Sequence, residues 1–318
     1  MKKIKLKKAG KISIGIIVFL IIAIIVGTKI YNNYLYKQTY EYKLLEKGYK
    51  LDDVKKLEKL FSKKRLDYIL SIDINDKLIP LASEKYYIDK NLEDYLTYLN
   101  DNDVDPATAV LKINTFTNYE FYNHDIPATD YSKTIIANKF YLLKEDYVPE
   151  NLVDISNLYA WGTDNKATEE TLNAFIQMQQ ACKEEIGITI MINSSYRSYE
   201  EQQEVYDYYK KLYDEAYADS IAARPGHSEH QTGLALDIFS YTDRIQKTFS
   251  EGETYKWLKD NSYKYGFILR YPEGKENITG FSFESWHYRY VGLDIAKAIY
   301  DSGLTYEEYY AYYIENNE

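Results

Sequence analysis

The pattern of apolar and polar positions changes along the chain, and it begins with an apolar run from Ile12 to Thr28 (ISIGIIVFLIIAIIVGT). These 17 residues are at the lower limit for a helix that crosses a bilayer core of about 30 Å. Six lysines precede the run, and such residues remain on the cytoplasmic side of a membrane helix. We therefore expect a cytoplasmic basic tail at residues 1–11 and a transmembrane anchor at residues 12–31.

A cleaved signal peptide is the alternative interpretation of the same run. The run is longer than the usual apolar core of a signal peptide, and no clear A-x-A cleavage site follows it. With either interpretation, the rest of the chain works outside the cytoplasm.

Residues 33–125 show helical spacing, and no cluster of ionisable residues with catalytic spacing occurs there. Asp52 is placed to cap the first helix. Two apolar sets each share one helical face: Val54, Leu57, Leu60 and Phe61, and then Leu92, Tyr95, Leu96 and Leu99. We expect a helical spacer or small helical domain, with a wall-binding or partner-binding module as the alternative.

From about residue 130 the pattern becomes mixed. Thr168 can cap a helix that has acidic residues in its first turn. The alternation from Ile188 to Ile192 predicts a strand, and a polar helix is predicted from Tyr199 to Ala218. Further strands are expected at Gly233–Ile238 and within Phe281–Val291. Helices and strands without a repeating βαβ period predict an α+β fold for residues 130–318, with a small mixed or antiparallel sheet flanked by helices.

Composition excludes several classes of protein. Residues 1–32 hold seven lysines and no acids, which leaves 32 basic against 49 acidic residues in the rest of the chain. Such a segment lacks the basic surface that nucleic-acid binding requires. The single cysteine, Cys182, excludes an intramolecular disulfide and CxxC-type zinc or redox chemistry. Its register in a predicted amphipathic helix makes it a core residue rather than a nucleophile.

The segment Arg224–Asp237 (RPGHSEHQTGLALD) contains the first candidate chemistry. In the predicted strand, Asp237 points to the side opposite Leu236 and Ile238. An aspartate in an apolar strand is costly unless it is paired or bound to a cation. His230 can converge on that carboxylate, and nitrogen and oxygen ligands together suit zinc. The alternative is that Asp237 only bonds a loop and that His230 lies on the surface.

The segment Glu284-Ser-Trp-His287 favours the metal interpretation. If Trp286 to Val291 is a strand, His287 points away from the face of Trp286 and can supply a third ligand. Three protein ligands with an open position for water are typical of catalytic zinc. Glu284 lies just before the strand, where a carboxylate can accept a proton from a metal-activated water.

Arg197 follows the strand predicted at Ile188–Ile192. An arginine at a strand-to-helix junction is well placed to bind a carboxylate through two hydrogen bonds. Taken alone, the same position is also consistent with an ordinary surface arginine.

Together these segments resemble the VanY-type D-alanyl-D-alanine carboxypeptidases, which include related L,D-carboxypeptidases of peptidoglycan. The family pattern S-x-H-x-x-G-x-A-x-D corresponds to Ser228–Asp237 here, E-x-W-H corresponds to Glu284–His287, and S-x-Y-R-S corresponds to Ser194–Ser198. Order and spacing both agree, over roughly residues 130–305. The resemblance implies a fold of the hedgehog and D-Ala-D-Ala-peptidase type for residues 130–318. With the predicted anchor, we expect a single-pass protein of the bacterial cell membrane whose C-terminal domain is extracytoplasmic.

The resemblance also implies a role for each matching residue. It implies one Zn²⁺ per chain, held by His230, Asp237 and His287, with Glu284 as the catalytic base. It further implies four residues that bind the substrate: Arg197, which takes the terminal carboxylate, and Ser198, Gln202 and Ser228. Of the other histidines, His227 lies near the motif without belonging to it, and His124 lies outside the match.

The activity implied by the resemblance is removal of the terminal D-alanine from peptidoglycan stem peptides. An L,D-carboxypeptidase or an endopeptidase on the same scaffold is the nearest alternative. A non-catalytic wall-binding or signalling protein is a different class, but its signature would be a missing ligand or base, and neither is missing here.

Overall fold

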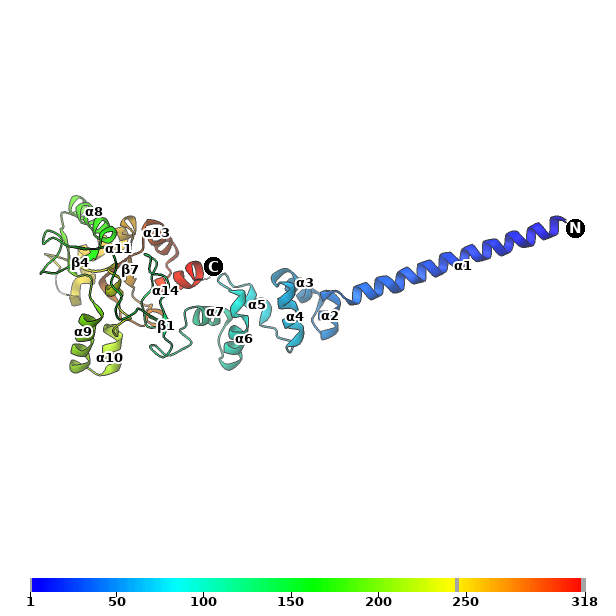
Figure 1. Cartoon of the computed structure of the whole chain (residues 1–318), viewed down its shortest axis with the longest axis horizontal. Coiled ribbons are helices and arrows are strands. Elements are labelled where there is room, and N and C mark those ends of the chain that lie inside the picture. The colour runs from blue at the N-terminus through cyan, green and yellow to red at the C-terminus, as the bar shows by residue number, and fades with distance from the viewer. Residues whose placement is uncertain (1, 244–245, 316–318) are drawn as a thin grey trace. The chain divides into compact units, whose positions relative to one another are not determined.

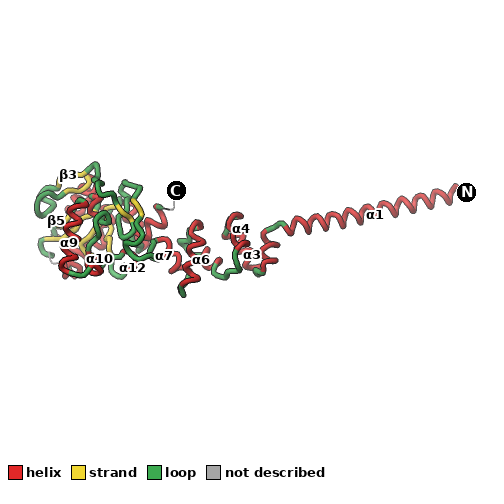
Figure 2. Tube along the Cα trace, turned by 60° about the horizontal axis from the view of Figure 1, so that its bottom comes forward, coloured by secondary structure: helices red, strands yellow, loops and turns green. Residues whose placement is uncertain are grey.

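The computed structural model of the chain describes residues 2–243 and 246–315. The chain forms two compact units, Met1–Ala107 and Thr108–Glu318 (Figure 1). Among the described residues, strands occur in the second unit alone (Figure 2). The boundary between the units, after Ala107, comes earlier in the chain than the change of sequence pattern at residues 125–130.

The first unit begins with the long helix α1 (Lys2–Lys37). Its Gly15–Lys37 stretch is long and apolar enough to cross a membrane, by length and composition, and none of it is buried within the protein. The helices that follow are α2 (Tyr40–Lys47), α3 (Leu51–Leu60), α4 (Lys63–Ser71), α5 (Leu78–Ala82), η1 (Asp89–Asn91) and α6 (Leu92–Asp101).

One expected cap in this unit is wrong. Helix α3 begins at Leu51, and Lys50 is its N-cap residue without a side-chain hydrogen bond. Asp52 lies in the first turn instead, where its carboxylate interacts favourably with the helix dipole. The helical face predicted in α6 is confirmed, because all four of its apolar members are buried: Leu92, Tyr95, Leu96 and Leu99.

The second unit is α+β, as expected. Its helices are α7 (Pro106–Asn114), which crosses the boundary between the units, and α8 (Glu169–Ile186), α9 (Tyr199–Leu212), α10 (Glu215–Ile221), η2 (Glu229–Thr232), η3 (Gln246–Glu251), α11 (Glu253–Asn261), η4 (Ser262–Tyr265), α12 (Glu276–Thr279), α13 (Leu293–Ser302), α14 (Tyr306–Tyr309) and η5 (Tyr310–Ile314). Its short strands are β1 (Ile126–Pro127), β2 (Tyr141–Leu142), β3 (Leu152–Asp154) and β4 (Lys166–Thr168).

The main sheet has four antiparallel strands in the order β5–β6–β8–β7, and these are β5 (Ile190–Ser194), β6 (Ala235–Ser240), β8 (Glu284–Tyr290) and β7 (Phe267–Tyr271). The strands expected from the apolar alternation correspond to β5, β6 and β8. The sequence pattern did not predict β7, which forms the edge next to β8.

Two helix boundaries follow from capping. The hydroxyl of Thr168 accepts from the backbone N–H of Thr171 and begins α8, as predicted. The polar segment expected as one helix is two helices instead, because Tyr213 is extended and Asp214 caps α10. A side chain that satisfies the free N–H groups of a helix start favours a new helix at that residue.

The two faces of the main sheet differ in chemistry. One face belongs to the apolar core together with residues of α8 and α11, and its buried members include Leu236, Ile238, Tyr288, Tyr290, Phe175, Met178, Cys182 and Leu258. Cys182 is therefore a core residue, as predicted. The alternate positions of β6 and β8 carry Asp237 and His287. Because successive strand residues point to opposite sides, the polar positions collect on the other face.

Candidate active site

Strand register brings the first two candidate ligands together. In the antiparallel pair β6–β8, Asp237 lies directly opposite His287. Side chains of such a pair stand on the same face about 5 Å apart. The Oδ1 atom of Asp237 and the Nδ1 atom of His287 are 3.2 Å apart.

The short helix η2 delivers the third candidate ligand. His230 lies in this turn, which ends at Gly233 with a left-handed φ of 66°. The Nδ1 atom of His230 is 2.7 Å from the carbonyl oxygen of Ser195. A carbonyl oxygen only accepts, so Nδ1 carries the proton and Nε2 keeps its lone pair. That Nε2 atom lies 3.6 Å from Oδ1 of Asp237.

The three ligand atoms fit a small divalent metal ion. They all lie within 4.8 Å of one another. Tetrahedral zinc with ligands at about 2.0–2.1 Å places neighbouring ligand atoms roughly 3.3 Å apart, close to the separations from Asp237 to His230 and His287. Oδ1 of Asp237 is buried and has no hydrogen-bond partner among the described residues. A buried carboxylate oxygen without a partner is costly unless a cation binds it.

The charge around His287 also favours a bound cation. Burial alone would lower the pKa of His287, but Asp237 and Glu229 outweigh burial and raise this pKa to about 9. The pocket therefore attracts positive charge at this ring. A metal ion bound at Nδ1 would supply that charge in place of a proton.

Glu284 lies at the start of β8, beside the ligand cluster. Its Oε2 atom is 3.7 Å from Nδ1 of His287. The pairing of β7 with β8 is irregular between Leu269 and Tyr271, and this irregularity allows Glu284 and His287 to face one cavity despite their spacing of three. Burial raises the pKa of Glu284 to about 7, near the value that suits a general base at neutral pH.

Arg197 lines the same cavity. Its Nη1 donates to Oε1 of Gln202 at 2.7 Å, and its Nη2 donates to the hydroxyl of Ser194 at 2.8 Å. The Nε2 atom of Gln202 in turn donates to the carbonyl oxygen of Ala223 at 2.7 Å. The guanidinium is thus oriented by two neighbours.

The cavity has a volume of about 130 Å³, and the candidate residues that line it are Arg197, Gln202, Ser228, His230, Asp237, Glu284 and His287. Ser198 is not among the lining residues, because its side chain caps α9. His227 is not among them either, and its Nδ1 bonds the carbonyl of Asn138 at 2.7 Å. His124 stacks on Tyr119. The fold therefore brings together all of the predicted metal and base residues and most of the predicted substrate residues.

A buried ionic network behind the ligands was not predicted from the sequence. The Oε1 atom of Glu229 accepts from Nε of Arg270 at 2.7 Å and from Nη1 of Arg289 at 2.9 Å. Arg270 also donates to both oxygens of Glu307, at 2.9 and 2.6 Å. All four side chains are nearly inaccessible to solvent. Burial would raise the pKa of Glu229, but the two arginines hold it below the ordinary value.

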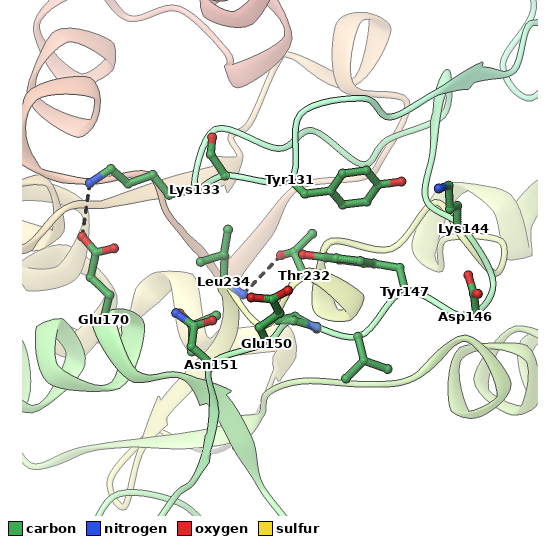
Figure 3. Close-up of a pocket in the computed structure, with 14 residues that line it drawn as sticks. Tyr131, Lys133, Lys144, Asp146, Tyr147, Glu150, Asn151, Glu170, Thr232 and Leu234 are labelled. Atoms are coloured by element: carbon green, nitrogen blue, oxygen red, sulfur yellow. Dashed lines mark hydrogen bonds and ion pairs between the residues drawn. The ribbon is translucent and has the colours of Figure 1, made fainter.

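A second, larger cavity of about 770 Å³ lies elsewhere on this unit. Figure 3 shows Tyr131 and Tyr147 on one side of it and the ion pair between Lys133 and Glu170 on the other. None of the candidate site residues lines this cavity. It is therefore separate from the ligand cluster.

The chain is similar to known carboxypeptidases in sequence and in fold. The family model VanY, D-alanyl-D-alanine carboxypeptidase, matches residues 164–293. One relative is the protein YodJ of Bacillus subtilis (strain 168), which is provisionally named as a carboxypeptidase. It is 38% identical over 236 residues, which is 69% of this chain and 86% of that protein. A D-alanyl-D-alanine carboxypeptidase of Enterococcus faecalis (strain V583) is 48% identical over 132 residues, which is 39% of this chain and 48% of the relative.

A solved structure supports the fold. The LdcB LD-carboxypeptidase, described in connection with peptidoglycan recognition, is 40% identical with a TM-score of 0.52, and the match covers 56% of this chain and 85% of that chain. The chain is a hydrolase of the carboxypeptidase class. It belongs to the VanY family of D-alanyl-D-alanine carboxypeptidases.

Proposed function

We propose that this protein is a zinc-dependent D-alanyl-D-alanine carboxypeptidase that removes the terminal D-alanine from peptidoglycan stem peptides. The observation that carries the proposal is the single cavity lined by His230, Asp237, His287, Glu284 and Arg197. Three ligands, a base and a carboxylate-binding cation are the parts that hydrolysis of a C-terminal peptide bond requires.

The metal site would hold Zn²⁺ through Nε2 of His230, Oδ1 of Asp237 and Nδ1 of His287. When bound, zinc supplies Lewis acidity that activates a water molecule and polarises the scissile carbonyl. Glu284 takes the proton of the attacking water on its carboxylate and passes it to the amine of the departing D-alanine. The short distance from Oε2 of Glu284 to Nδ1 of His287 supports this role, because it places the base next to the ligand cluster.

Arg197 would bind the terminal carboxylate of the substrate. Within the described part of the chain, its guanidinium makes two side-chain hydrogen bonds, and an arginine has five N–H donors. The remaining donors can meet a carboxylate in the two-point geometry that arginine favours. Gln202 and Ser228 line the same cavity, and we assign them to substrate binding as well. Ser198 contributes indirectly, because it begins the helix that carries Gln202.

The linkage that is cleaved has two candidates. The similarity to the Enterococcus faecalis enzyme supports a D-alanyl-D-alanine bond, because that relative is named for this activity. The similarity to LdcB supports an L,D bond. We propose the D,D activity as the main one, since the family model carries that description.

A digest of defined muropeptides tests the activity. The full chain in detergent is incubated with pentapeptide and tetrapeptide stems, and the products are weighed by mass spectrometry. Release of D-alanine from the pentapeptide is expected, and this release should be lost on treatment with a chelator. Release from the tetrapeptide alone would assign L,D activity, and cleavage inside cross-linked dimers without loss of terminal D-alanine would assign an endopeptidase.

We propose further that α1 anchors the protein in the bacterial cell membrane as a single-pass helix, with residues 33–125 as a helical spacer and residues 130–318 as an extracytoplasmic catalytic domain. The support is the exposed apolar stretch Gly15–Lys37 and the lysines before it. Protease added to intact cells should digest the catalytic domain. Protection from that protease would overturn this topology.

A further inference from the structure

The ring of His287 has a second partner on its far side, away from the ligand cluster. Its Nε2 atom lies 3.6 Å from Oε2 of Glu229. Both atoms are buried, and neither has a hydrogen-bond partner in the described part of the chain. A shift of about half an ångström would bring these two atoms within the usual N–H···O hydrogen-bond distance.

Glu229 cannot easily turn away from His287. Its other oxygen, Oε1, accepts from both Arg270 and Arg289. Arg289 is fixed in turn by the carbonyl oxygens of Lys133 and Ile135. The carboxylate is therefore held by rigid, buried donors, and its free oxygen is directed at the histidine.

The charges of this network balance without the metal site. Glu229 and Glu307 carry two negative charges, and Arg270 and Arg289 carry two positive charges. A bound Zn²⁺ would be balanced separately by Asp237 and Glu284. Glu229 is thus not needed to neutralise the metal, and its effect on the metal passes through the ring of His287.

We propose that Glu229 is a positioning residue that holds His287 with its proton on Nε2, so that Nδ1 is presented to the metal ion. This inference rests on the proposed zinc site. A carboxylate partner fixes the tautomer and the ring orientation of a ligand histidine and makes it a stronger donor to the metal. His230 receives the corresponding support from the carbonyl of Ser195.

One short turn then serves both histidines. Glu229 and His230 are consecutive residues of η2. His230 points its Nε2 towards Asp237, whereas Glu229 points to the back of His287. A displacement of this turn would therefore disturb two ligands at once.

The test compares two carboxylates of the same network. Glu229→Gln removes the charge that faces His287, and Glu307→Gln removes the other carboxylate bound to Arg270. Within the described part of the chain, Glu307 bonds Arg270 and Asn138 and none of the candidate ligands. Zinc affinity of the full chain is measured at one pH by competition with a fluorescent chelator, and thermal unfolding is measured without zinc. We expect both variants to lose stability, but Glu229→Gln alone to bind zinc about 10- to 100-fold more weakly.

Glu229→Asp keeps a carboxylate and should recover part of the zinc affinity. Equal zinc affinity in wild type and Glu229→Gln would overturn the proposal, and so would an equal loss in Glu307→Gln. If wild type itself bound no zinc, the proposed function would fail instead, so the two failures are distinguishable.

A second measurement needs no variant, in case Glu229→Gln does not fold. In wild-type protein with labelled histidine and bound zinc, nitrogen NMR reports which ring atom of His287 carries the proton. The proposal requires a proton on Nε2 and the metal on Nδ1. The opposite assignment would overturn it.

Discussion

Arg197→Ala removes the group assigned to the substrate's terminal carboxylate. The side chain lies partly buried in the cavity, and Gln202 and Ser194 orient its guanidinium. Its loss should weaken the interaction with a substrate that ends in a carboxylate. It should matter far less for a substrate whose C-terminus is an amide, because that substrate lacks the partner charge.

The size of the effect follows from the two hydrogen bonds that the carboxylate would accept. Hydrogen bonds to charged groups contribute about 1.5–3 kcal/mol each, so two of them amount to about 3–6 kcal/mol. Every 1.4 kcal/mol or so is a factor of ten in kcat/KM. We therefore expect a loss of roughly 10² to 10⁴ in kcat/KM, towards the lower end because Arg197 is only partly buried.

The assay is a four-way comparison of wild type and Arg197→Ala on a stem peptide with a free carboxylate and on its amide. Arg197→Lys keeps the positive charge but lacks the planar guanidinium with its paired N–H donors. Its kcat/KM should therefore lie between those of wild type and Arg197→Ala. Lys210→Ala is the control, because Lys210 is a cation on α9, the helix that begins after Arg197, and does not line the cavity. Equal losses on the acid and on the amide would refute the assignment of Arg197 to the carboxylate.

Three further predictions concern other positions. Glu284→Gln should bind zinc as tightly as wild type while kcat falls by about 10²–10⁴; isothermal titration and initial rates check this, and near-full activity would remove Glu284 from its role. Gly233→Ala should lower the free energy of unfolding by about 1–3 kcal/mol, because φ is +66° and the new Cβ would lie 2.8 Å from a methyl of Leu152. Urea titrations measure this loss, and an unchanged unfolding midpoint would contradict it. Burial lowers the pKa of Lys139 to about 7 from 10.5. Between these pH values the unfolded state binds more protons than the folded state, so the free energy of unfolding should rise with pH. The difference in this free energy between wild type and Lys139→Met should show the rise, and a difference independent of pH would contradict it.

The ligand face of the sheet could be predicted because its signal is local. The alternation in β6 places Asp237 opposite Leu236 and Ile238, and the same rule places His287 in β8. The register that joins Asp237 to His287 depends on residues about fifty positions apart. The alternation alone could therefore indicate only that both point away from the core, whereas the resemblance to the VanY family implied that they share one metal site.

The buried network behind the ligands has no local signal. Arg270 and Glu229 are 41 positions apart, and Arg270 and Glu307 are 37 apart. The strand β7 carries the buried Arg270, and an arginine makes a segment look partly polar in the sequence. The apolar pattern therefore did not predict β7. The break at Asp214 was detectable, since an aspartate before a short amphipathic stretch is a typical N-cap.

The most direct test of zinc-dependent carboxypeptidase activity is restoration of that activity by metal. The full chain is stripped with a chelator, and D-alanine release from pentapeptide is followed as zinc is added back, with Glu284→Gln in parallel. We expect no release after stripping, recovery complete near one equivalent of zinc, and no recovery in Glu284→Gln despite zinc binding. Undiminished D-alanine release by the stripped protein would contradict a zinc-dependent mechanism.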